Sequence, residues 1–472
     1  MSPLRTARTA HAAPAARTRP QDSPRPRPRH PARTELVRGI GPWTGLTLAL
    51  VVGVGMYTAA PAWQGRWVAV TDALREYGIL FGVPLALAAG CWHGGRERRR
   101  GTGELVSTLP RSPLRRTMPA ALPAALWPAI GYLVAAGGSL LATWPYVSGG
   151  RPYASLVLAD AVALGSAGVL GFVAGRLVPW RLTAPLLAVL AYITLILFST
   201  YGNDPRLWLN PAALHDYFWD RPVWWFGPAA MVWTAGLATA ALLALAARRR
   251  AVAVLPLAAA CTAAVILVQT GDGLWRGDPE ASRLVCDDGT PQVCVSAVDK
   301  DLLPDVSAAL ADLNGKLRGI PGAPTRWISG PGAPGTGMYW SGSARVVRQG
   351  TAPAGPAPGD VELPSPYDAA VRGRIPEPAE YANSTVGWLF SETCPDSDFE
   401  LPGFDQASDI NSAVHQWLAP ASDFASYEDI AGVERHLKRL RAMDPAQGRA
   451  YLTRYIAGEA VPGCDPAEVP VP

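Results

Sequence analysis

The sequence has few charged residues, and it lacks the motifs of the common hydrolytic enzymes. Charged residues make up 17% of the 472 residues and hydrophobic residues 49%, so the chain is too apolar for an average soluble protein. It contains no Gly-x-x-x-x-Gly-Lys-Ser/Thr sequence, and therefore no P-loop for ATP. Gly-x-Ser-x-Gly, His-Glu-x-x-His and Cys-x-x-Cys are also absent, which removes the support for a serine hydrolase or a zinc enzyme. We expect no enzyme activity, no cofactor and no metal.

Lysine is almost absent, so arginine carries nearly all the positive charge, and its distribution divides the chain. Residues 1–39 hold nine arginines against two acidic residues, which predicts a disordered basic cytoplasmic tail that contacts the lipid bilayer. Residues 40–270 are a succession of apolar segments, predicted to form a transmembrane helical domain. Residues 271–472 hold 16 basic against 28 acidic residues and have a composition that can fold in water. This acidic balance argues against a nucleic-acid partner.

Seven apolar segments approach the ~20 residues that a helix needs to cross a bilayer core of ~30 Å. The second is the weakest, because Asp72, Arg75 and Glu76 leave only residues 77–92 cleanly apolar. Six spans is therefore the alternative to seven, and it would reverse the side on which the last domain lies. The predicted spans are 40–60, 71–92, 118–144, 153–177, 182–200, 224–247 and 251–269.

Arginine in the loops gives the orientation, because positively charged loops near span ends stay in the cytoplasm. The tail holds nine arginines and loop 96–116 holds seven. The next alternate loops hold Arg176, Arg181 and Arg248–Arg250. The N-terminus is thus predicted to be inside and, with seven spans, residues 271–472 form an extracytoplasmic domain of a multi-pass cell-membrane protein. The arginines assigned to the loops on the outer side are only Arg66, Arg75, Arg151, Arg206 and Arg221.

Tryptophan and tyrosine gather at the predicted outer ends of the spans. Both residue types prefer the membrane–water interface, so we interpret them as an interfacial belt rather than as a ligand site. The belt consists of Trp63, Trp67, Trp144, Tyr146, Tyr153, Tyr201, Trp208, Tyr217, Trp219, Trp224 and Trp225.

Four of the six cysteines lie in the C-terminal domain, and this placement suggests two disulfides in an exported domain. Three pairings are possible. A turn signal at residues 288–289 favours a local hairpin bridge between Cys286 and Cys294. That bridge would leave Cys394 to pair with Cys464.

Asp160 lies within an otherwise apolar span, and an ionisable residue in the membrane is a candidate for function. It is about 7 residues from the outer end, or ~10 Å deep at 1.5 Å per residue. Water or a neighbouring polar group could satisfy it there. A place on a substrate path and a role in pairing two helices are the alternatives. Cys91 and Cys261 also lie in spans, and we expect both to be buried thiols.

The loop between the second and third spans has a distinct pattern. Thr102 can cap a short helix whose first turn carries Glu104, and Pro110 would end that helix. A helix this short is not stable alone, so it must rest on the membrane, on neighbouring spans or in the groove of a partner. Its apolar face consists of Leu105, Val106 and Leu109.

This loop resembles that of permeases of type-2 ABC exporters, of the actinobacterial kind but with an added extracytoplasmic C-terminal domain. In that family an acidic–basic run is followed by Gly-Thr-x-Glu-Leu, and Pro stands nine positions after the Gly. Gly101, Thr102, Glu104, Leu105, Pro110, Arg111 and Ser112 hold those places here. Gly103 and Leu109 depart from the pattern. The resemblance implies that Gly101, Thr102, Glu104, Leu105, Val106, Leu109 and Pro110 couple the chain to a separate ABC ATPase subunit. A second copy of the permease is a further candidate partner.

The C-terminal domain reads as α/β or α+β. Gly330, Gly332 and Gly335 match Gly-x-Gly-x-x-Gly, but the prolines between them exclude a dinucleotide-binding loop. His415 and His436 have no metal motif around them and are expected on the surface or in packing. Strands are predicted at 293–298 and 337–348, and helices at 303–317, 412–418, 427–443 and 445–459.

The leading hypothesis is a permease subunit of an ABC-type exporter, energised by an ATPase in trans, with the outer domain gating or receiving the substrate. The alternative is a non-transporting membrane-anchored sensor or interaction protein with an extracytoplasmic ligand-binding domain. A membrane-bound hydrolase is a third reading, and the missing nucleophile and metal motifs count against it.

Overall fold

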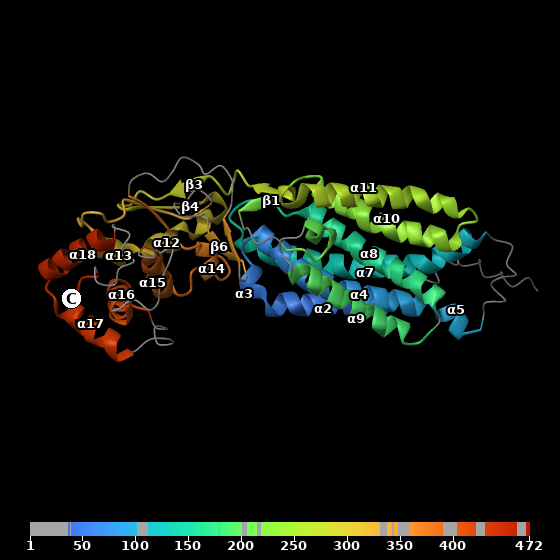
Figure 1. Ribbon diagram of the computed structural model, residues 1–472, viewed down its shortest axis with the longest axis horizontal. Coiled ribbons are helices and arrows are strands. Elements are labelled where there is room, and N and C mark those ends of the chain that lie inside the picture. The colour runs from blue at the N-terminus through green and yellow to red at the C-terminus, as the bar shows by residue number, and fades with distance from the viewer. Residues whose placement is uncertain are drawn as a thin grey trace, which may run out of the picture.

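The described part of the chain is elongated, with a helical bundle at one end and a smaller domain of helices and strands at the other (Figure 1). The bundle is formed by residues up to about 274, and the rest is called the C-terminal domain. The computed structural model describes residues 36–37, 39–101, 112–178, 180–200, 205–214, 219–330, 338–341, 344–347, 359–389, 404–421, 430–459 and 469–472.

Each of the seven predicted spans is a helix. Five are long and apolar enough to cross a membrane. The other two, α2 (Gly41–Thr58) and α9 (Thr183–Thr200), have 18 residues each, which is about 27 Å at 1.5 Å per residue. The five are α4 (Trp67–Gly94), α7 (Pro113–Thr143) with η1 (Trp144–Tyr146), α8 (Ala154–Leu177), α10 (Phe226–Ala246), and α11 (Val254–Thr270) between η3 (Arg250–Ala253) and η4 (Gly271–Leu274).

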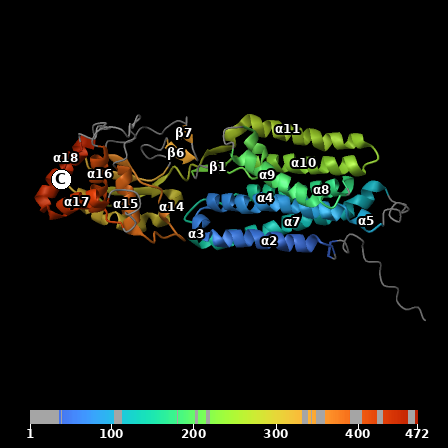
Figure 2. The ribbon, with the colours of Figure 1, turned by 60° about the horizontal axis from the view of Figure 1, so that its bottom comes forward.

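The arginine-rich connections lie at one end of the bundle. Both views place the short helix α5 (Arg96–Arg99) and the connection between α10 and α11 at the end farthest from the C-terminal domain (Figures 1 and 2). The C-terminal end of α8 lies there too, because Arg176 forms an ion pair with Glu97 of α5. The arginine-rich turns and the C-terminal domain are therefore at opposite ends of the bundle.

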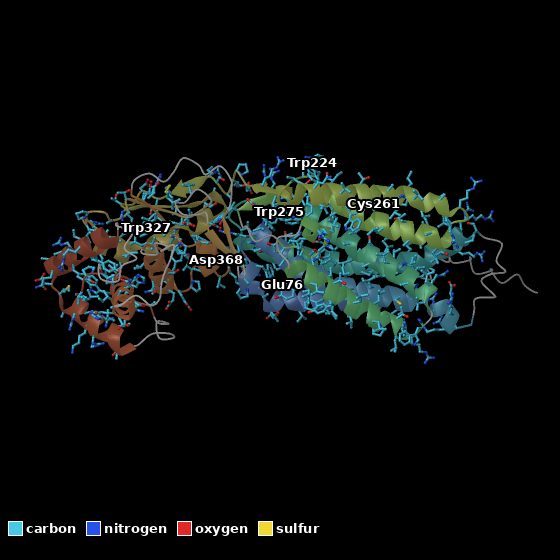
Figure 3. The ribbon with its side chains drawn as sticks, in the orientation of Figure 1. Glu76, Trp224, Cys261, Trp275, Trp327 and Asp368 are labelled. Atoms are coloured by element: carbon cyan, nitrogen blue, oxygen red, sulfur yellow. A yellow bond between two sulfur atoms is a disulfide. The ribbon has the colours of Figure 1, made fainter. Side chains whose placement is uncertain are left out.

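The second helix is longer than its hydropathy indicated. It begins at Trp67 rather than at residue 71, and Asp72, Arg75 and Glu76 lie in its first turns. Glu76 is toward the end nearer the C-terminal domain (Figure 3). The assignment of Arg75 to a loop was wrong, since its side chain is 3% exposed within the bundle. A carboxylate on another helix pairs with it, and the hydropathy of a single segment cannot reveal such a partner.

Glycine lets α4 and α8 pack closely. A methyl group at Gly171 or Gly175 of α8 would overlap the backbone carbonyl oxygen of Leu87 or Cys91 on α4. Gly90 of α4 faces the backbone of α8 in the same way. Small residues at membrane helix contacts allow backbones to approach and gain van der Waals energy. This packing fixes the register of α4 against α8.

The C-terminal domain contains a four-stranded sheet in the order β3-β4-β5-β8, in which β3 and β4 are antiparallel and the other pairs are parallel. The strands are β3 (Leu284–Cys286), β4 (Gln292–Ser296), β5 (Arg326–Ile328) and β8 (Asp360–Glu362). A second pair, β6 (Met338–Ser341) and β7 (Ala344–Val347), is antiparallel, where the sequence predicted one long strand. The short strands β5 and β8 were not predicted, because three residues give no periodicity to recognise.

Helices pack against this sheet around a core that includes the fully buried Trp327, Tyr451 and Tyr455. The predicted helix 303–317 is interrupted at Leu310, so it forms two helices instead of one. The last predicted helix matches α18, and α15 was not predicted. The helices are α12 (Leu303–Ala309), α13 (Ala311–Leu317), α14 (Pro366–Ala369), α15 (Pro378–Leu389), α16 (Phe404–Leu418), α17 (Ile430–Ala442) and α18 (Pro445–Glu459).

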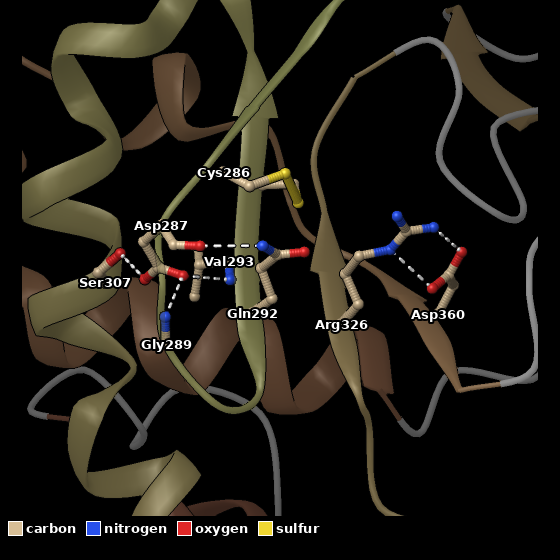
Figure 4. Close-up of a disulfide and its surroundings, with 9 residues drawn as sticks. Cys286, Asp287, Gly289, Gln292, Val293, Ser307, Arg326 and Asp360 are labelled. Carbon is tan, nitrogen blue, oxygen red and sulfur yellow. Dashed lines mark hydrogen bonds and ion pairs between the residues drawn. A yellow bond between two sulfur atoms is a disulfide. The ribbon is translucent and has the colours of Figure 1, made fainter.

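The local disulfide is confirmed. Cys286 and Cys294 are opposite each other in the β3–β4 ladder and form a bridge with Cα atoms 4.0 Å apart (Figure 4). Asp287 fixes the hairpin, because its carboxylate accepts hydrogen bonds from the backbone N–H of Gly289 and Val293 and from the Ser307 hydroxyl. Cys394 and Cys464 lie outside the described residues, so their pairing stays a prediction.

Two partly buried ionisable groups give the C-terminal domain opposite pH dependences. Burial lowers the pKa of His415 to about 4, so stability held above pH ~6.5, on the order of 3 kcal/mol, is lost as pH falls through 4. Burial raises the pKa of Glu362 to about 8, so stability held below pH ~4.5 is lost as pH rises through 8.

In a plot of the domain's stability against pH, we expect His415→Gln to flatten only the fall at acid pH and Glu362→Gln only the fall at alkaline pH. The free energy of unfolding of the C-terminal domain, measured by urea titration at each pH, checks this. The unfolded fraction is read with a brief labelling pulse that is always given at the same pH, so that the labelling rate does not vary.

Candidate functional site

A buried ion pair joins α4 to α8 inside the bundle. Asp160 is 1% exposed and Arg75 is 3% exposed, and Arg75 Nε lies 3.4 Å from Asp160 Oδ1. The hydroxyl of Tyr132 on α7 donates to Asp160 Oδ2 at 3.1 Å. Three helices therefore contribute to one polar cluster in an apolar bundle. An uncompensated charge would be costly there, so the geometry favours helix pairing over a substrate path as the role of Asp160.

The segment before α10 closes this cluster on its other side. Arg75 Nη1 donates to the carbonyl of Ala213 at 3.1 Å, and its guanidinium carbon lies 5.6 Å from the centre of the Phe226 ring. A cavity of about 20 Å³ adjoins Arg75, Asp160 and Asn210. It is large enough for about one water molecule, so it does not accommodate a substrate. The arrangement holds a charge pair in place and leaves it little access.

A second buried ion pair joins the bundle to the C-terminal domain. Arg66 precedes α4 and is 4% exposed; Asp299 lies in η5 (Ala297–Leu302) and is 2% exposed. Arg66 Nε donates to Asp299 Oδ1 at 2.9 Å, and Nη2 contacts the other oxygen. The guanidinium carbon also lies over the rings of Trp219 and Tyr367, 4.5 and 4.4 Å from their centres. Bidentate pairing with a carboxylate and contact with aromatic rings are interactions that arginine combines and lysine does not. We call this arrangement the Arg66 joint.

Further contacts surround the Arg66 joint. The Tyr367 hydroxyl donates to the carbonyl of Ala62 at 2.9 Å, and Arg372 Nε donates to Gln64 Oε1 at 3.0 Å. Asp368 lies at the junction of the two parts (Figure 3). Burial raises its pKa, while the charge of Arg66 lowers it. Strand β1 (Asp220–Pro222), which precedes α10, pairs antiparallel with β2 (Trp275–Gly277), which follows α11.

The aromatic residues at this end form two groups rather than one belt. Trp63, Trp67, Trp208 and Trp219 are buried in packing, so the belt interpretation was wrong for them. Their contacts with the rest of the fold could not be read from position along the chain. Exposed aromatic side chains remain at the same end, as a belt requires: Trp144 and Trp224.

The loop predicted to bind an ATPase lies between a glycine that ends one helix and a serine that caps the start of the next. Gly101 has φ +64°, a left-handed conformation that glycine adopts at little cost and that commonly ends a helix. Ser112 caps α7 by accepting a hydrogen bond from the backbone N–H of Arg115. The remaining coupling residues, Thr102, Glu104, Leu105, Val106, Leu109 and Pro110, lie outside the described residues, as does Arg111.

Two histidines and two cysteines that the sequence singled out lie on helices. His415 and His436 lie on helices of the C-terminal domain, and the described residues contain no group of His, Cys, Asp and Glu that could hold a metal. Gly330 is described, and residues 331–337 are not. Cys91 is buried as expected, but Cys261 is exposed on the outward face of α11. That prediction was wrong because an apolar span still exposes one face to its surroundings.

Sequence reasoning missed the Arg66 joint altogether. Arg66 was counted only as a loop charge, and Asp299 only as part of an acidic balance. A bidentate pair between residues 233 positions apart has no local signal. Comparisons with models of protein families, with curated proteins and with solved structures found no match to this chain.

Proposed function

We propose that this chain is the permease subunit of an ABC-type exporter, with seven spans, the C-terminal domain outside the cell and a separate ATPase docking on loop 96–116. The observation that carries the proposal is the position of α4. This helix of 28 residues, about 42 Å long at 1.5 Å per residue, begins next to the Arg66 joint and ends next to α5 and the coupling motif. One continuous helix thus connects the two regions that an exporter has to coordinate.

The contacts along α4 suit it to transmit a displacement. At its first end the Arg66–Asp299 pair attaches it to the C-terminal domain. Farther along, the Arg75–Asp160 pair and the glycine contacts hold it against α8. Just beyond its last residue, Glu97 of α5 pairs with Arg176 of α8. A push from an ATPase on this end would move α4 and α8 together, and the outer domain with them.

The orientation is supported by charge. The connections rich in arginine lie at the end of the bundle away from the C-terminal domain. Arginine-rich loops stay in the cytoplasm, which would leave the C-terminal domain outside. The Cys286–Cys294 bridge agrees with an oxidising compartment. In this position the outer domain would gate or receive a substrate on its release from the bundle.

Leu105→Asp tests the coupling. If the apolar face of the loop docks in a groove of the ATPase, a charge there costs several kcal/mol, roughly 2–7 for an unpaired polar group. We expect the amount of ATPase that co-purifies to fall at least ~10-fold, since a loss of ~1.4 kcal/mol in binding free energy already weakens the affinity tenfold. The amount of this chain in the membrane should not change.

Val252→Asp is the matched control. Val252 is an exposed apolar residue in η3, at the start of the last span and at the same end of the bundle. This variant should retain the ATPase. If no ATPase co-purifies with the unaltered chain, or if Leu105→Asp retains as much as Val252→Asp, the permease proposal fails. The chain would then be a membrane-anchored sensor or interaction protein.

A further inference from the structure

A sizeable cavity lies at the arginine-rich end of the bundle, between the start of α2 and the end of α4. Its volume is about 350 Å³, well above that of the cavity beside Asp160. Among the described residues that line it are none of the Arg66 joint, and Gly101, the one coupling residue that the structure describes, does not line it either. The cavity is lined by Gly39, Ile40, Trp92, His93, Arg96, Arg99 and Arg100.

The charged side chains among the described residues that line the cavity are all basic or histidine. Three guanidinium groups line it, and the described residues that line it include no acidic side chain. Arg99 is held in place, because its guanidinium donates to the carbonyl of Trp92 and stacks over the Trp92 ring at 4.1 Å. Burial lowers the pKa of Arg99, and the charges of Arg181 and Arg100 lower it further. A bound anion would offset this repulsion.

The rim of the cavity is apolar on the side of α2. Ile40 and Trp92 line the cavity and are 39% and 47% exposed. From the cavity, exposed apolar side chains continue along one face of α2, three or four residues apart. This face consists of Trp43, Leu46, Leu50 and Val54.

We propose that this cavity binds the phosphate headgroup of an anionic phospholipid, with the acyl chains along the exposed face of α2. Basic pockets at the ends of membrane helices are suited to such headgroups. A free phosphate would use the arginines and leave the apolar face uncovered, whereas a phospholipid matches both. The bound lipid ties the start of α2 to α5, directly before Gly101. This inference requires that the bundle spans a membrane, but not that an ATPase binds.

Native mass spectrometry of the full-length chain in a neutral detergent tests the site. The probes are phosphatidylglycerol, phosphatidylcholine and inorganic phosphate, each added separately. We expect phosphatidylglycerol to bind at least ~10-fold more tightly than the other two. The triple variant R96Q/R99Q/R100Q should lose at least ~10-fold in affinity for phosphatidylglycerol, since each basic residue near an anionic lipid surface contributes about fivefold.

R248Q/R249Q/R250Q is the matched control, because it removes the same charge from another arginine cluster at the same end. It should change the affinity less than ~2-fold, which is well below the fivefold expected for each contacting arginine. Equal losses in the two triple variants would overturn the proposal, as net charge alone would then explain binding. Equal binding of phosphatidylcholine, or of inorganic phosphate, would overturn it too. If the triple variant does not reach the membrane, Arg100→Gln replaces it, and an unchanged affinity there is the contradicting result.

Discussion

Replacing Arg66 by glutamine should loosen the C-terminal domain from the bundle by about 3–5 kcal/mol, the usual cost of removing one partner of a buried ion pair. Asp299 is 2% exposed, so its carboxylate would remain in a dry environment without its bidentate partner. The rings of Trp219 and Tyr367 would lose the cation that lies over each of them. Hydrogen exchange at residues 297–302 and at the start of α4 should rise together in the purified full-length chain.

Arg374→Gln provides the matched control for this result. Arg374 pairs with Asp305 in the same domain, but its side chain is 79% exposed. An exposed pair contributes about 0–1 kcal/mol, so this variant should leave exchange at residues 297–302 unchanged. Arg66→Met combined with Asp299→Leu should recover most of the lost stability, because apolar residues of similar volume often replace a buried pair without loss. If Arg66→Gln behaves like Arg374→Gln, the two parts are not held by this pair.

Replacing Asp160 by leucine should destabilise the bundle by about 3–5 kcal/mol, because it leaves Arg75 charged and nearly inaccessible among α4, α8 and α10. Less folded chain should accumulate in the membrane, and the detergent-solubilised chain should unfold at lower temperature. Tyr132→Phe removes only one hydrogen bond to the same carboxylate and should cost about 1 kcal/mol.

The double variant Arg75→Met, Asp160→Leu separates a structural pair from a transport residue. Both charges disappear together, so folding should return toward that of the unaltered chain. If the pair only joins helices, ATPase coupling in this variant should also be retained. Restored folding with lost coupling would contradict helix pairing as the role of Asp160 and favour the substrate path. Asp160→Leu without any loss of folded chain would contradict the ion pair itself.

The sequence indicated the bundle well because its signal is local. A run of about 20 apolar residues that crosses a bilayer is recognisable by itself, and the ends of α8, α9 and α18 fall within one residue of those predicted. Arg75 was misplaced because its burial depends on Asp160, which is 85 positions away in the chain. The Cys286–Cys294 bridge could be predicted for the same reason as the spans: its signal is local, because both residues belong to one hairpin.

The candidate site was predicted only in part. Asp160 was singled out, whereas its partners Arg75 and Tyr132 come from two other helices that no local pattern connects. The Arg66 joint depends on four residues from separate regions of the chain: Arg66, Trp219, Asp299 and Tyr367. Tertiary packing brings them together, and no local pattern in a single sequence indicates which distant residues will be in contact. The coupling motif is local and was read from the sequence, and its helix stays a prediction.

Proteolysis of intact protoplasts compared with inverted vesicles tests most directly whether α4 joins an outer domain to a cytoplasmic coupling loop. We expect protease to remove residues 271–472 from intact protoplasts while loop 96–116 stays whole. In inverted vesicles the loop should be cut and the C-terminal domain protected. Protection of the domain in protoplasts, with cleavage only in inverted vesicles, would contradict the account, because the domain and the ATPase-docking loop would then lie on the wrong sides of the membrane.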